Sequence, residues 1–288
     1  MNVRSSSALA SSRTLALLLF ISVASLSAAA LKFTAVNVPG SIATQIFGIN
    51  ASGAIVGSYT TSTFLLKGFV RKGTTYADVV YPGTTFDIAT GINDSAAIVG
   101  YYADANGNDH GFLYKSGNFT VIDAPAATST MAMGINNHGV IVGFYFDSQG
   151  LSHAFELEHG KFTVINGPGA IRTAANKINN RGVIVGYYFD PNFRQHGFIL
   201  ANGTLRTVDF PLANASTEMN GLNDSELVLG DYATSQGNTG FAYHNGKFSA
   251  FSYPGSNFTF PEDVNGRFTI VGSYSDANNV SHGFMLNR

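Results

Sequence analysis

The chain of 288 residues contains no cysteine and no tryptophan, and only 12% of its residues are charged. The lack of cysteine excludes disulfide bonds and thiolate chemistry, so stability has to come from packing and sheet hydrogen bonds. The lack of tryptophan removes the usual platform for stacking a sugar, although the 13 tyrosines can substitute for it. The 16 basic residues form no basic patch, which argues against a nucleic-acid partner.

Long apolar runs are also rare, and the one that stands out lies at the N-terminus. "TLALLLFISVASLS" follows a segment that carries Arg4 and Arg13 and precedes the small residues "AAA". This order predicts a secretory signal peptide over residues 1–30, cleaved near Ala30, and therefore an extracellular or periplasmic protein. The run spans about 14 residues, short of the roughly 20 that cross a bilayer, so we expect no membrane span in the mature chain. Loss of both arginines leaves 14 basic against 18 acidic residues, a charge of −4.

What the chain has in plenty is glycine and aromatic residues. It contains 32 Gly, 13 Tyr and 23 Phe within a 45% hydrophobic composition. Such a chain can build a sizeable core, and these residues favour many short strands joined by tight turns over helices. The composition predicts an all-β protein.

The sequence repeats every 43 residues. A proline recurs at Pro39, Pro82, Pro125, Pro168, Pro211 and Pro254. A phenylalanine recurs at Phe69, Phe112, Phe155, Phe198, Phe241 and Phe284. Between them, and each time seven residues before a glycine, stand Asn50, Asn93, Asn136, Asn179, Asn223 and Asn265. Residues 31–288 are therefore six copies of one unit and form a single domain.

Each unit contains four runs typical of β-strands, which we call A to D. In the third unit these are "MAMGIN", "GVIVGFYFD", "SHAFELEHG" and "KFTVIN", separated by turns rich in Gly, Asn and Asp. Run B is apolar on both faces, as expected for a strand covered by a neighbouring sheet on each side. A period in the forties with four strands per unit predicts a six-bladed β-propeller with four-stranded blades.

The two ends of the repeat predict how the ring closes. "LKFTAVNVPG" at residues 31–40 matches strand D with no blade before it, whereas the last unit stops at "HGFMLNR" without its strand D. We expect the N-terminal strand to complete the C-terminal blade, which leaves no free edge.

Family resemblance rests on "SHAF" at residues 152–155, on "HGF" at 110–112, 196–198 and 282–284, and on the "GIN…IVGYY" frames. These motifs resemble the HAF-type repeats of bacterial extracellular proteins. The resemblance implies export and a propeller-like body, without an agreed activity. The first and fifth units depart from it with "KGF" and "TGF", so the histidine is not required in every blade.

Four histidines share one repeat position, and an aspartate precedes each by six residues. We interpret them as structural pairs that hold the hairpin between strands B and C: Asp104 with His110, Asp147 with His153, Asp190 with His196 and Asp276 with His282. Coincidence in a turn-rich sequence is the alternative. A metal site is not expected, because equivalent atoms of adjacent blades should be about 10 Å apart, whereas zinc ligands lie roughly 2 Å from the ion.

Signatures of catalysis and of cofactors are missing. The chain has no G-x-S-x-G elbow, no H-E-x-x-H helix and no phosphate loop, so we expect no cofactor. "DANGND" at residues 104–109 resembles part of a calcium loop but lacks the spaced bidentate glutamate, which favours a plain hairpin turn.

Only the fifth unit changes length, with one residue gained in the D–A loop and one lost in the B–C loop. These two kinds of loop share one face of a four-stranded antiparallel blade, which we call the D–A/B–C face. Charges that do not repeat stand near the first strands of the blades, and we expect them on that face as ligand-binding candidates: Asp87, Arg172, Lys177, Glu218, Glu262 and Asp263. For any one of them a solvated rim position is the alternative.

Two functions are compatible with this pattern. The first is a monomeric, secreted propeller that binds a polar small molecule, a glycan or a partner protein. The second is an extracellular hydrolase or lyase that uses Glu218, Glu262 and Asp263, by analogy with enzymes that share the fold. Strongly raised carboxyl pKa values inside the mouth would favour the enzyme.

Overall fold

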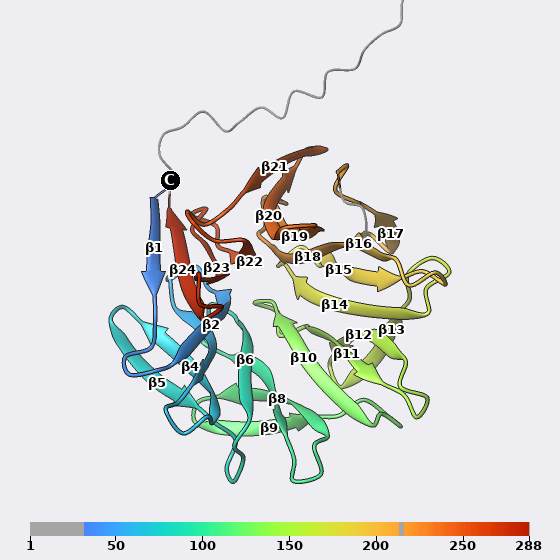
Figure 1. The fold of residues 1–288 in the computed structure, drawn as a ribbon. Coiled ribbons are helices and arrows are strands. Elements are labelled where there is room, and N and C mark those ends of the chain that lie inside the picture. Colours follow the sequence, from blue (N-terminus) through green and yellow to red (C-terminus); the bar gives the residue numbers. More distant parts are fainter. Residues whose placement is uncertain (1–31, 213–215, 288) are drawn as a thin grey trace, which may run out of the picture.

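The computed structural model describes residues 32–212 and 216–287, and the predicted signal peptide lies outside this part of the chain. The described residues form six four-stranded antiparallel sheets arranged around a central axis (Figure 1). The predicted six-bladed β-propeller is confirmed. No helix among the described residues is long and apolar enough to cross a membrane.

The strands follow the sequence order within each blade. Blade 1 contains β2 (Ala43–Ile49), β3 (Ile55–Thr60), β4 (Leu66–Lys72) and β5 (Thr75–Val79). Blade 2 contains β6 (Asp87–Ile92), β7 (Ile98–Ala103), β8 (Asp109–Lys115) and β9 (Asn118–Ile122). Blade 3 contains β10 (Ser129–Ile135), β11 (Ile141–Phe146), β12 (Ser152–Glu158) and β13 (Lys161–Ile165).

The second half of the ring is built in the same way. Blade 4 contains β14 (Arg172–Ile178), β15 (Ile184–Phe189), β16 (Gln195–Ala201) and β17 (Thr204–Thr207). Blade 5 contains β18 (Thr217–Leu222), β19 (Val228–Thr234), β20 (Gly237–His244) and β21 (Lys247–Phe251). Blade 6 contains β22 (Phe258–Val264), β23 (Ile270–Ser275), β24 (Ser281–Asn287) and the N-terminal β1 (Lys32–Val36).

The strand pairing of blade 6 closes the ring. β1 pairs antiparallel with β24, with Phe33 opposite Leu286 and Val36 opposite Gly283. The ring of Phe33 also packs edge-on against that of Phe284, 5.5 Å away between centroids. The first and last strands of the described chain therefore complete one sheet, as the sequence predicts.

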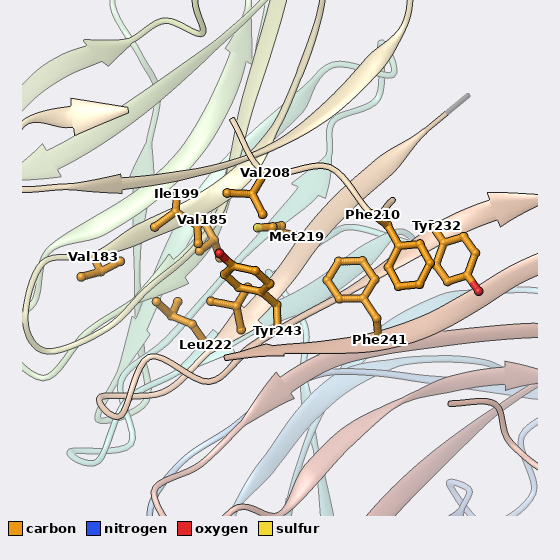
Figure 2. Packing of buried hydrophobic residues seen from close by; sticks show 11 residues of the cluster. Val183, Val185, Ile199, Val208, Phe210, Met219, Leu222, Tyr232, Phe241 and Tyr243 are labelled. Carbon is orange, nitrogen blue, oxygen red and sulfur yellow. The ribbon is translucent and has the colours of Figure 1, made fainter. Parts of the chain in front are cut away.

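Apolar residues are buried mainly between neighbouring blades. Figure 2 shows one such cluster, in which Val183, Val185 and Ile199 of blade 4 meet Met219, Phe241 and Tyr243 of blade 5. The repeated phenylalanine is fully buried in every blade. The glycine inside strand B is required for the same reason: a Cβ on Gly143 would overlap the carbonyl oxygen of Met131 on the adjacent strand and touch the ring of Phe155.

The repeated asparagines link all six blades in a closed ring of hydrogen bonds at the A–B turns. Each side-chain amide donates to the backbone oxygen of the equivalent asparagine in the next blade at 3.1–3.2 Å, and Asn265 returns to Asn50. Each side-chain oxygen also accepts from two backbone N–H groups of its own turn, as Asn136 does from His138 and Val140. One residue type thus fixes the turn and joins the blades.

Candidate functional site

The inner strand of every blade carries a β-bulge near its centre. The register shifts by one residue between Ile46 and Gly48 in blade 1, and at the equivalent place in the other five blades. A bulge leaves one residue without a partner and turns its side chain toward a new direction. The six bulged residues all line a cavity in the central channel: Phe47, Thr90, Met133, Asn176, Asn220 and Glu262.

This central cavity has a volume of about 230 Å³. The remaining lining residues are Lys177, Glu218, Asp231, Asn238 and Phe260. Glu218 lies at the start of β18 and Asn238 at the start of β20, so the cavity lies toward the D–A/B–C face. Blades 4 to 6 contribute three carboxylates, three amides, Lys177 and Phe260, whereas blades 1 to 3 contribute Phe47, Thr90 and Met133. One wall is therefore polar and acidic, and the opposite wall is largely apolar.

Glu218 is held by amide groups from blade 4. The side-chain nitrogen of Asn176 donates to Glu218 Oε1 at 3.2 Å, and that of Gln195 donates to Oε2 at 3.1 Å. Burial, with the nearby charge of Asp231 as a smaller contribution, raises the pKa of Glu218 to about 7 against the lowering effect of these two hydrogen bonds. A carboxyl group with this pKa can hold or release a proton near neutral pH.

Asp231 is a residue of the cavity that the pattern of non-repeated charges near the first strands does not include. Its carboxylate accepts hydrogen bonds from Asn220 at 2.9 Å and from Asn238 at 2.7 Å. Burial raises its pKa to about 6. A signal was present, because Asp231 follows the strand B glycine, where the other units have Ser58, Tyr101, Phe144, Tyr187 and Ser273. It is the only acid at that repeat position and belongs to the unit with altered loops.

Glu262 is the third carboxylate, on the bulge of blade 6. No hydrogen bond or ion pair to its carboxylate is found among residues 32–212 and 216–287. Burial raises its pKa well above the ordinary value, and the charges of Glu218 and Asp231 add to this effect, whereas Lys177 lowers it. The three carboxylates thus share one cavity and oppose one another's ionisation.

Lys177 crosses the channel below this cavity. Its Nζ atom donates to the backbone oxygens of Phe47 at 2.8 Å and Thr90 at 2.7 Å, and lies 3.7 Å from Asp263 Oδ2. The crossing is possible because the equivalent residue is glycine in four blades: Gly48, Gly91, Gly134 and Gly221. Lys177 separates the cavity from a second hollow of about 150 Å³, which the A–B turns surround.

Asp263 lies on the other side of Lys177 from Glu218. It lines the hollow at the A–B turns, and its carboxylate accepts from the N–H groups of Ile49 at 3.1 Å and Val264 at 2.9 Å. Burial raises its pKa, and Lys177 partly offsets this shift. The expectation that Asp263 joins Glu218 and Glu262 at one mouth is therefore wrong, because the bulge directs two consecutive residues of β22 into different compartments.

Asp87 and Arg172 do not line the central cavity either. Asp87 is fully buried, and its carboxylate accepts from the N–H of Tyr81 at 2.8 Å and from the hydroxyl of Thr84. In the other five blades a threonine hydroxyl makes the equivalent hydrogen bond to the D–A loop. Asp87 replaces that threonine, so its role is to fix the loop rather than to meet a ligand. Arg172 begins β14, and its Nε is buried without a hydrogen-bond partner in the described chain.

The structure brings each predicted Asp and His pair together at a B–C hairpin. The His Nε2 to Asp Oδ2 distance is 2.9 Å for His153, 3.2 Å for His282, and 3.6 Å for both His110 and His196. In the two longer pairs, the His Nδ1 atom lies closer to another aspartate, Asp123 at 3.0 Å or Asp209 at 2.8 Å. Two of the histidines thus connect the B–C hairpin to the D–A loop that follows the outer strand of the same blade.

The loop at Asp104 is a hydrogen-bonded hairpin turn. Asp104 Oδ1 accepts from the N–H groups of Asn106 at 2.8 Å and Asn108 at 2.9 Å, and these contacts hold the pKa of Asp104 at about 2. Within the described chain, no three His, Asp or Glu side chains are grouped so that they could hold a metal ion.

No protein-family model matches the chain, and no curated protein matches it. Among solved structures, it resembles the fucose-specific lectin from Aleuria aurantia at a TM-score of 0.57 and 11% identity, over 86% of this chain and 96% of the lectin. AofleA from Arthrobotrys oligospora matches at 0.54 and 12%, over 90% and 86%. Virginiamycin B lyase from Staphylococcus aureus matches at 0.51 and 11%, over 88% of both chains. The likeness is one of fold.

Proposed function

We propose that this protein is a binding module that takes a polar ligand into the central cavity. The observation that carries the proposal is the convergence of Glu218, Asp231 and Glu262 on one wall of an open cavity. Packing alone does not require these acids, since the equivalent positions in other blades hold apolar or neutral residues. Crowded, partly buried carboxylates destabilise a fold, and such arrangements are typical of functional sites.

The chemistry of the cavity favours a ligand that donates hydrogen bonds and carries an apolar side. Ammonium or hydroxyl groups would satisfy the carboxylates, and Phe47, Met133 and Phe260 would cover carbon atoms. Sugars and small amines have this character. The fold likeness to a fucose-specific lectin is compatible with a saccharide, because it shows that propellers of this shape serve as binding modules.

The test is calorimetric titration of the protein with methyl glycosides of neutral and amino sugars and with short-chain amines. We expect at least one class to bind, with affinity that drops at least tenfold in a Glu218→Gln, Glu262→Gln double variant. For amines and amino sugars, the affinity should also fall as salt is added. Glu158→Gln, which removes an exposed acid from an outer part of blade 3, is the matched control. Equal binding by the double variant would place the site elsewhere.

A second candidate function is an extracellular hydrolase or lyase. Raised carboxyl pKa values in the cavity support it, as expected for an enzyme: about 7 for Glu218, about 6 for Asp231, and well above the ordinary value for Glu262. A carboxyl group such as Glu218, protonated near neutral pH, can act as a general acid beside an ionised neighbour. Asp231, rather than Asp263, would be that neighbour. Turnover of any glycoside or ester by the parent that is lost in Glu218→Gln, with the melting temperature retained, would establish the enzyme over the binding module.

Export and membership of the HAF-type repeat family are part of the same proposal. Both rest on the sequence, through the predicted signal peptide and the "SHAF" and "HGF" motifs. Expression of the full chain in a bacterial host, followed by mass spectrometry of the extracellular and periplasmic fractions, tests export. A mature chain beginning at Leu31 is the expected product, and a full-length chain retained in the cytoplasm would contradict it.

A further inference from the structure

Exposed apolar side chains gather on the D–A/B–C face. Nine large hydrophobic residues of the described chain are exposed. Six of them lie on the loops of this face: Ile42, Phe64, Leu65, Phe86, Phe193 and Leu212. Clusters of exposed apolar residues on one face of a soluble domain are typical of an interaction surface.

Two of these residues occupy a position that disfavours them. Phe64 and Phe193 are the αL residues of their B–C hairpins, with φ of 62° and 59°, and are 80% and 68% exposed. The equivalent residues in three other blades are Gly107, Gly150 and Asn279. Glycine and asparagine adopt this conformation readily, whereas a bulky side chain is strained there. The strained aromatic side chains contribute little to packing, so the fold does not explain their presence.

The two phenylalanines stand on opposite sides of the central cavity. Phe64 belongs to blade 1, between β3 and β4, and Phe193 belongs to blade 4, between β15 and β16, three blades further around a six-bladed ring (Figure 1). Leu65, Ile42 and Phe86 lie on the loops near Phe64, and Leu212 lies on the loop that follows blade 4. Two apolar patches therefore flank an acidic cavity on one face.

We propose that the D–A/B–C face docks a partner protein that inserts a lysine or arginine side chain into the central cavity. This inference rests on the proposed function of that cavity and names the class of partner. The inserted cation would meet Glu218, Asp231 and Glu262, while apolar residues around it would contact Phe64 and Phe193. Charge complementarity supports a cation, because the ammonium of Lys177 is already used by two carbonyl oxygens and Asp263.

The charges of the same face favour a protein over a phospholipid surface. Four B–C loops carry an aspartate, and these residues would repel lipid phosphates: Asp104, Asp147, Asp190 and Asp276. A cavity of about 230 Å³ accommodates one side chain rather than a chain segment. A basic side chain on an apolar surface would pair with the carboxylates of the cavity, while the surface around it would contact the exposed apolar residues of the loops.

The experiment selects binders from a library of random surface loops displayed on a rigid carrier domain, with the parent protein as bait. We expect enriched loops to carry Lys or Arg next to apolar residues. They should bind at least tenfold more weakly both to Glu218→Gln, Glu262→Gln and to Phe64→Gly, Phe193→Gly. The glycine variant should melt at or above the temperature of the parent, which separates loss of contact from loss of folding.

Three controls identify the other outcomes. This inference falls and the proposed function stands in two cases. In the first, N-acetyl-lysine methylamide binds the cavity but no basic loops are enriched. In the second, the enriched loops bind the Phe64→Gly, Phe193→Gly variant as tightly as the parent. If neither that amide, nor the sugars and amines, nor the loops bind in a manner that depends on Glu218 and Glu262, both fall. Co-sedimentation with phosphatidylcholine vesicles that requires Phe64 and Phe193 would assign the face to a membrane and overturn the inference.

Discussion

At the scale of the residue, the buried acids differ in the hydrogen-bond donors that surround them. Asp87 and Asp263 accept backbone hydrogen bonds, and Asp263 also has Lys177 beside it. Glu262 is buried beside the like charges of Glu218, Asp231 and Asp263, and has no hydrogen-bond donor in the described chain. Burial raises the pKa of all three acids, and hydrogen bonds offset part of that penalty for Asp87 and Asp263. Glu262 has no such offset, so it destabilises the ring most and leaves hydrogen-bonding capacity for a ligand.

Glu262→Gln should therefore stabilise the protein. An acid whose folded pKa is raised binds its proton more tightly in the folded state, so its contribution to stability falls as pH rises from the unfolded value of about 4.3 through the folded value. We expect the variant to be more stable than the parent at pH 8, by a few degrees of melting temperature, with a smaller gain at pH 4. Thermal unfolding of both proteins at the two pH values measures this. A variant that loses stability at pH 8 would show that Glu262 has a partner.

At the scale of the element, the hairpin between strands B and C is the unit that the Asp and His pairs stabilise. In blade 3, the hydrogen bond from His153 and the N–H groups of Leu151 and Gln149 lower the pKa of Asp147. A group with a depressed folded pKa contributes stability above its unfolded pKa of about 3.9, and this contribution is lost as pH falls through the folded value.

Asp147→Asn should lower the melting temperature at pH 7 by a few degrees, and the deficit should shrink as pH falls below about 4. The amide still caps the turn but no longer bears the charge that the histidine prefers. Thermal unfolding of the parent and the variant between pH 2 and pH 7 measures it. His138→Asn, which removes a histidine from an A–B turn of the same blade, is the control. A deficit that is constant over this range would exclude an ionic contribution to the pair.

At the scale of the whole molecule, contacts across the channel and around the ring join the blades. Lys177 of blade 4 reaches blades 1, 2 and 6 through Phe47, Thr90 and Asp263. A buried pair of this kind contributes little net stability compared with uncharged residues, but removal of one partner leaves an uncompensated charge.

Lys177→Met should therefore destabilise the protein by about 3–5 kcal/mol. The double variant Lys177→Gly, Asp263→Gly restores the glycine of the other four blades and should lose less than the sum of the two single changes. Urea denaturation of the four proteins gives the coupling energy. Additive losses would mean that the two side chains do not interact, contrary to their 3.7 Å separation.

The N-terminal strand β1 closes the ring and should be needed for its stability. Deletion of Lys32–Val36 from a chain that begins at Leu31 should expose the edge of β24 and remove the packing of Phe33 on Phe284. We expect aggregation or a melting temperature lower by at least ten degrees, since a sheet edge and a blade seam are lost together. Differential scanning calorimetry with light scattering measures both. An unchanged transition would contradict closure by the N-terminal strand.

The sequence alone determined the ring, its blade number and its closing strand, because each unit repeats the same local signals 43 residues apart. It also indicated the Asp and His pairs, which lie six residues apart within one hairpin. The side chains that line the channel could not be predicted in this way. A bulge in each inner strand breaks the alternation of side chains, so Glu262 and Asp263 point into separate compartments, and neighbours at the axis are far apart in sequence, as Asn265 and Asn50 are. Only the tertiary structure decided which of the non-repeated charges lie close together. The six copies converge at the axis of the ring, and no local sequence pattern predicts contacts between residues of different copies.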